Sequence, residues 1–124
     1  MATVRRIAIV IEPWPVLADL VAEALQRMGY EVATAATHAG GATKAAAYGR
    51  VDLGVAAVPA LGEERKDSYL LEARNANDRM CMIVMLSDPA APTDDMPPSA
   101  ETIVKPFSFD DLKAAVERAN HASS

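Results

Sequence analysis

The sequence contains one cysteine, Cys81, among its 124 residues. A lone thiol cannot form an intrachain disulfide or a multi-cysteine metal site. No apolar run approaches the roughly 20 residues that a membrane-spanning helix needs, so we expect no membrane span. Basic residues are also scarce, because 12 Lys and Arg stand against 17 Asp and Glu, for a net charge of -5. Since nucleic acid is bound by basic surfaces, we expect no nucleic acid partner.

What the sequence does contain is the composition of a globular domain, with 51% hydrophobic and 23% charged residues. A chain of this length can bury one modest core. We therefore predict a single domain over residues 1–120, followed by a short flexible tail over 121–124. The apolar run after Arg5 and Arg6 is too short for a signal peptide, which favours a cytoplasmic location.

Apolar runs and helical stripes alternate along the chain. Continuous apolar runs are typical of buried parallel strands, and apolar residues spaced three and four apart are typical of helices. Strands are predicted over residues 6–11, 30–35, 51–58, 80–86 and 102–104, and helices over about 15–28, 39–48, 67–77 and 108–119. This alternation predicts an α/β fold with a flavodoxin-like, doubly wound, five-stranded parallel sheet of strand order 2-1-3-4-5.

Helix boundaries carry recognisable signals. Gly29 is expected to end the first helix, and Thr37 and Ser108 are expected to cap the starts of the second and the last. An unbroken apolar stripe marks the first helix: Val16, Leu17, Leu20, Val21, Ala24, Leu25 and Met28.

The interval from 88 to 100 contains four prolines among thirteen residues: Pro89, Pro92, Pro97 and Pro98. Proline removes a helix hydrogen bond and clashes with the preceding turn. The fourth helix of this fold is therefore predicted to be short, irregular or missing.

Polar and charged residues follow the predicted strands where each one ends. Glu12 follows the first strand, Ser87 the fourth and Lys105 the fifth. The carboxyl ends of parallel strands meet at one edge of an open α/β sheet, where such folds bind ligands. The sequence therefore predicts a site at this edge.

Five segments in the same order and spacing make nearly the whole chain resemble the receiver domains of bacterial two-component response regulators. They are Ile9–Pro15, Met28–Val32, Val51–Leu53, Ile83–Ser87, and Val104–Phe107 followed by Asp110-Asp111-Leu112. In that family two acidic residues hold Mg²⁺, an aspartate accepts the phosphoryl group, and a hydroxyl and a lysine contact its oxygens. The resemblance makes Glu12, Ser87 and Lys105 remnants of that phosphoryl pocket.

Three positions depart from the family pattern. Pro13 stands in place of the second acidic residue, Ala57 in place of the phosphoacceptor and Thr102 in place of the switch aromatic. Alanine has no nucleophile, and one remaining carboxylate forms a poor Mg²⁺ site. We therefore expect no cofactor and no metal, and the chain looks like a degenerate receiver, or pseudo-receiver. The proline-rich interval also resembles a compact alphaproteobacterial subfamily with a reduced fourth helix.

The resemblance implies a stand-alone module of two-component signal transduction and phosphorelay that binds proteins independently of phosphate. The expected partner is a histidine kinase, another receiver or a downstream target, with a homodimer as a further option. Two alternatives remain: phosphorylation at an atypical acceptor, or sensing of a small ligand in the vacated pocket. Catalysis is not expected, because no histidine base lies beside Ser87 in the pattern of motifs.

Individual residues also have competing interpretations. A salt bridge from Lys105 to Glu12 is favoured over a phosphate-sensing role, since an unpaired buried ammonium is costly. Trp14 is expected to pack over the vacated pocket, with a partner surface as the alternative. Asp52 is interpreted as a surface residue at the opposite edge, and Cys81 as a buried, unreactive thiol.

Overall fold

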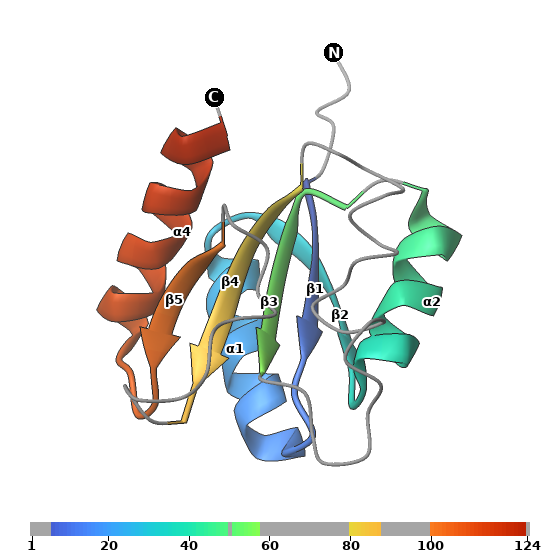
Figure 1. Ribbon diagram of the computed structural model, residues 1–124, viewed down its shortest axis with the longest axis horizontal. Coiled ribbons are helices and arrows are strands. Elements are labelled where there is room, and N and C mark those ends of the chain that lie inside the picture. Colours follow the sequence, from blue (N-terminus) through green and yellow to red (C-terminus); the bar gives the residue numbers. More distant parts are fainter. Residues whose placement is uncertain (1–5, 50, 58–79, 88–99, 124) are drawn as a thin grey trace.

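A computed structural model describes residues 6–49, 51–57, 80–87 and 100–123. Within these ranges the chain alternates between strands and helices (Figure 1). In chain order the elements are β1 (Arg6–Ile11), α1 (Pro15–Arg27), β2 (Tyr30–Ala35), α2 (His38–Tyr48), β3 (Leu53–Ala57), β4 (Cys81–Leu86), β5 (Glu101–Val104) and α4 (Phe109–Ser123).

The five strands form one parallel sheet in the order β2-β1-β3-β4-β5. This confirms the predicted flavodoxin-like topology. The predicted helix over 67–77 and the predicted irregular interval, except for Ala100, lie outside the described residues.

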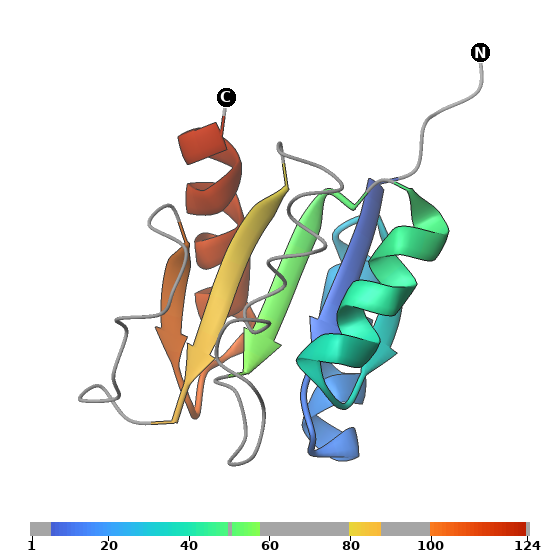
Figure 2. The same ribbon diagram turned by 45° about the vertical axis from the view of Figure 1, so that its right-hand side comes forward.

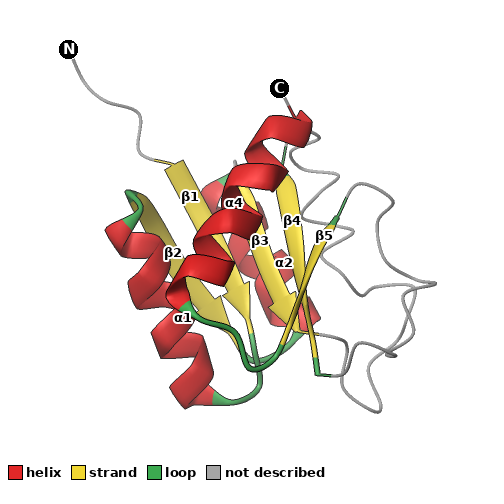
Figure 3. Cartoon of the chain, turned by 90° about the vertical axis from the view of Figure 1, so that its left-hand side faces the viewer, coloured by secondary structure: helices red, strands yellow, loops and turns green. Residues whose placement is uncertain are grey.

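The sheet is covered on both faces, which explains the continuous apolar runs of its central strands. Every residue of β3 and β4 is buried. One core cluster packs between the sheet and helices α1 and α4, which lie side by side on the same face (Figure 3). A second cluster packs on the opposite face and includes Ala45 of α2 (Figure 2). No described helix has the length and apolarity needed to cross a membrane.

Local signals explain where the helices begin and end. Pro15 starts α1, where its missing N–H costs nothing, and Gly29 follows the helix with a φ of 100° that other residues rarely adopt. The Thr37 hydroxyl accepts a 3.0 Å bond from the Gly40 N–H and caps α2 as predicted.

The start of α4 is fixed by a reciprocal pair of hydrogen bonds. The Asp111 N–H donates to the Ser108 hydroxyl, and the Ser108 N–H donates to the Asp111 carboxylate, both at 3.0 Å. The helix then buries Leu112, Ala115, Val116 and Ala119 against the sheet. It continues to Ser123, beyond the predicted domain end at residue 120, because no glycine or proline stops it there.

Strand β3 begins at Leu53, two residues later than predicted, and Asp52 precedes it. The Asp52 carboxylate accepts a 2.9 Å hydrogen bond from the Ile7 N–H, and its own N–H donates to the Ile7 carbonyl. Asp52 is half-buried at the amino edge of the sheet and joins β1 to β3. The sequence placed it at the correct edge but missed this structural role.

Candidate functional site

The carboxyl ends of β1, β3, β4 and β5 lie along the same edge of the sheet, where the arrowheads point in Figure 1. The pairing register sets these ends beside one another: Ile11 lies opposite Ala56, Ala57 opposite Met85, and Leu86 opposite Val104. The structure thus places Glu12, Ala57, Ser87 and Lys105 at one edge.

An ion pair joins two of these residues across the sheet edge. The Lys105 Nζ lies 2.5 Å from Oε1 of Glu12, as the sequence predicted. The Glu12 side chain is only 4% exposed, whereas that of Lys105 is 27% exposed. A buried carboxylate needs such a partner, because burying an unpaired charge is expensive.

The second oxygen of Glu12 is also engaged. Its Oε2 accepts a 3.1 Å hydrogen bond from the backbone N–H of Trp14. The Glu12 backbone N–H donates to the Ala35 carbonyl, and the Lys105 N–H donates to the Leu86 carbonyl. Both oxygens of the carboxylate therefore have partners within the chain. Sequence reasoning missed the Trp14 contact, because it depends on the conformation of the turn after β1.

The other predicted site residues offer little chemistry to this pair. Ala57 is buried in the core cluster beside α1 and α4, and Pro13 is exposed. Ser87 is exposed at the end of β4, and Thr102 is exposed on β5. Of these four residues, only Ser87 and Thr102 have side chains that can form hydrogen bonds, and both are exposed.

The residues that the structure describes at this edge do not fit a Mg²⁺ site. Magnesium needs octahedral oxygen coordination, with carboxylates as its protein ligands. Of the three family positions that would supply them, only Glu12 bears a carboxylate, and Lys105 and the Trp14 N–H occupy it. Within the part of the chain that the structure describes, no group of three His, Cys, Asp or Glu side chains could hold a metal.

The Trp14 side chain does not pack over the pocket. It is 58% exposed, so the favoured interpretation of this residue was wrong. Val16 and Leu20, two and six residues further along, are 55% and 59% exposed. The first turns of α1 therefore present large apolar side chains to solvent, as a partner surface would.

The predicted burial of Cys81 is confirmed. The residue is buried, and its Sγ lies 3.4 Å from the Ala119 carbonyl oxygen of α4. This environment favours a packing role.

The fold resembles those of solved receiver domains, although no family model and no curated protein matches the sequence. A CheY-like receiver domain protein from Methanospirillum hungatei has a TM-score of 0.76 at 19% identity, covering 96% of this chain and 97% of that one. Response regulator TrrA from Thermotoga maritima, in complex with Mg²⁺ and BeF, has a TM-score of 0.70 at 25% identity, with coverage of 92% and 98%. Chemotaxis protein CheY4 from Vibrio cholerae has a TM-score of 0.75 at 18% identity, covering 94% of this chain and 99% of that one. The chain therefore has the CheY-like receiver fold that the sequence predicted.

Proposed function

We propose that this chain is a degenerate response regulator receiver that works in two-component signalling by binding another protein, without accepting phosphate and without catalysis. One observation carries the proposal: the buried Glu12 carboxylate holds Lys105 with one oxygen and the Trp14 N–H with the other. The two groups that would otherwise serve Mg²⁺ and the phosphoryl oxygens are thus bonded to each other.

The cost of separating Lys105 from Glu12 favours the ion pair over contact with an anion. If Lys105 left Glu12 to contact an incoming anion, the nearly buried carboxylate would lose its counter-ion. Breaking such a pair costs about 3 kcal/mol. No phosphoaspartate at position 57 could compensate, because Ala57 cannot form one.

The partner is proposed to be a histidine kinase, another receiver or a downstream target protein. Receiver domains generally interact with such proteins, and the exposed apolar residues of α1 are the surface features that support binding here. With a net charge of -5, nucleic acid is not proposed as a partner.

Exposure to a small phosphodonor tests the proposal directly. The chain is incubated with acetyl phosphate and Mg²⁺, and its intact mass is measured before and after hydroxylamine treatment, with a phosphorylatable receiver as positive control. The expected result is an unchanged mass. A hydroxylamine-sensitive phosphoryl adduct would overturn the proposal and favour an atypical acceptor.

A further inference from the structure

A hollow of about 390 Å³ lies between α4, the end of α1 and the first residues of the sheet. Arg6 and Tyr30, which line it, begin β1 and β2 and are opposite each other in the strand register. They place one end of the hollow at the amino edge of the sheet, whereas Glu12 and Lys105 lie at the carboxyl edge (Figure 3). Small organic ligands bind in spaces of about 300–1,000 Å³, so the hollow has a suitable size.

Positive charge predominates in this hollow. Arg6, Arg27 and Lys113 line it. Glu117 is the one acidic residue among the described residues that do so. Arg27 is paired with Glu23 at 2.9 Å, but within the described part of the chain neither Arg6 nor Lys113 forms a salt bridge. In a chain of net charge -5, this local excess of cations favours an anion as the ligand.

The guanidinium of Arg6 is held in place by its neighbours. It lies 5.0 Å from the centroid of the Tyr30 ring, and Tyr30 is itself buried. The Tyr30 hydroxyl accepts a 3.5 Å hydrogen bond from Nδ2 of Asn120 on α4. A guanidinium restrained in this way loses little freedom when its N–H groups donate in pairs to the oxygens of a carboxylate or a phosphate.

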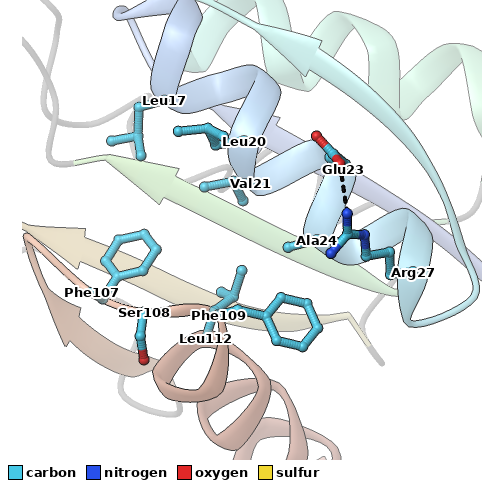
Figure 4. A pocket seen from close by; sticks show the side chains of 10 residues that line it. All are labelled: Leu17, Leu20, Val21, Glu23, Ala24, Arg27, Phe107, Ser108, Phe109 and Leu112. Atoms are coloured by element: carbon cyan, nitrogen blue, oxygen red, sulfur yellow. Dashed lines mark hydrogen bonds and ion pairs between the residues drawn. The ribbon is translucent and has the colours of Figure 1, made fainter.

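Apolar side chains complete the lining of the hollow. Met28 is half-buried, Val116 is buried, and Phe109 is 42% exposed. Phe109 and Arg27 also line a neighbouring groove between α1 and α4, from opposite sides (Figure 4). A thioether and an aromatic ring offer adaptable apolar contacts. An inorganic ion would leave these contacts unused, so a ligand with an apolar body fits the hollow better.

We propose that this hollow binds a small organic anion, in which a carboxylate or phosphate group is attached to an apolar or aromatic body. The oxyanion faces Arg6 and Lys113, and the body packs against Met28, Val116 and Phe109. None of these residues belongs to the ion pair at the carboxyl edge. The inference therefore goes beyond the proposed function and does not depend on it.

Four probes test the proposal by amide NMR titration of the ¹⁵N-labelled chain: 2-naphthyl phosphate, 2-naphthoate, neutral 2-naphthamide and inorganic phosphate. We expect saturable shifts at the amides of Arg6, Met28, Lys113 and Asn120 with both naphthyl anions. Each should bind at least about five-fold more tightly than 2-naphthamide, which forms no ion pair, and than inorganic phosphate, which has no apolar body. The tighter of the two anions identifies the preferred oxyanion.

A thermal measurement gives an independent readout. A ligand that binds only the folded chain stabilises it, so both naphthyl anions should raise the midpoint of thermal unfolding as their concentration increases. At equal concentration, 2-naphthamide and inorganic phosphate should raise it less.

Substitutions distinguish a defined site from a general attraction between charges. Arg6→Gln and Lys113→Gln should each weaken binding of 2-naphthyl phosphate by about five-fold. Arg118→Gln is the matched control, because it removes the same charge from α4 at a residue that lines a different hollow, and binding should stay unchanged. Phe109→Ser should weaken binding of both naphthyl anions but not of inorganic phosphate. All four side chains are exposed, so the variants should fold.

Equal affinity for inorganic phosphate and the naphthyl anions would overturn the inference, because the hollow would then be a surface that attracts any anion. Equal losses from Arg118→Gln and Arg6→Gln would also overturn it. Shifts confined to the carboxyl edge, around Glu12 and Lys105, would contradict it as well and would place the ligand in the vacated phosphoryl pocket.

Discussion

Replacing Lys105 tests whether the ion pair at the sheet edge stabilises the fold as the geometry requires. In Lys105→Met the Glu12 side chain, 4% exposed, keeps the Trp14 N–H but loses its counter-ion. We expect a loss of about 3 kcal/mol in the free energy of unfolding, the low end of the range for broken buried pairs. The loss lies low in that range because Lys105 itself is 27% exposed, so water already reaches this side of the pair.

Replacing Glu12, the other residue of the ion pair, should reduce the free energy of unfolding by less than replacing Lys105 does. Glu12→Gln retains an oxygen that accepts from the Trp14 N–H, and it leaves a Lys105 ammonium that can reach water. We expect about 1 kcal/mol for this variant and about the same for the double variant, hence a coupling energy of about 3 kcal/mol. Urea denaturation followed by circular dichroism measures all four proteins. Since domains of this kind have about 5–15 kcal/mol of stability, each variant should remain folded.

A matched control exists in the same part of the fold. Glu101 of β5 pairs with Arg118 of α4 at 3.2 Å, but the side chains are 29% and 52% exposed. The corresponding cycle with Glu101→Gln and Arg118→Met should give a coupling of at most about 0.5 kcal/mol. Equal couplings for the two pairs, or additive effects of the Glu12 and Lys105 substitutions, would refute the reasoning.

Substitutions at three further positions test the local structure by urea denaturation. Asp52→Ala, which leaves the Ile7 N–H without its side-chain acceptor, should lose about 1 kcal/mol; Asp52→Asn should lose less, and equal losses would contradict the assigned bond. Ser108→Ala should lose about 1 kcal/mol and speed hydrogen exchange at the Asp111 amide; unchanged exchange would argue against the cap. Gly29→Ala should cost about 1 kcal/mol because φ is 100°, and a neutral result would dispute that conformation.

Apolar runs made the sheet predictable. Buried parallel strands are apolar at every position, so β1 and β2 were placed with their observed bounds. The ion pair between Glu12 and Lys105 was also predictable, because strand order brings both to one edge and burial requires a partner for each charge.

Two kinds of feature were not predictable from the sequence: hydrogen bonds that depend on loop conformation, and the extent to which neighbouring elements bury the apolar face of a helix. The bond from the Trp14 N–H to Glu12 requires a particular turn after β1, and no residue type specifies it. The sequence predicts an unbroken apolar stripe along α1, but Val16 and Leu20 of this stripe are exposed to solvent. Periodicity shows which residues share a helix face, but not how far a neighbouring helix covers that face, so the exposure of these two residues could not be predicted from the sequence.

The measurement that tests the central claim most directly is an amide NMR titration of the chain with Mg²⁺ and then beryllofluoride. The account predicts no saturable shifts at Glu12, Ala57, Ser87 and Lys105, because the carboxylate and the ammonium are bonded to each other. The double variant Pro13→Asp with Ala57→Asp, which restores the missing carboxylates, serves as the positive control. Saturable shifts clustered at these four amides of the unmodified chain would show a working phosphoryl pocket and would contradict the account.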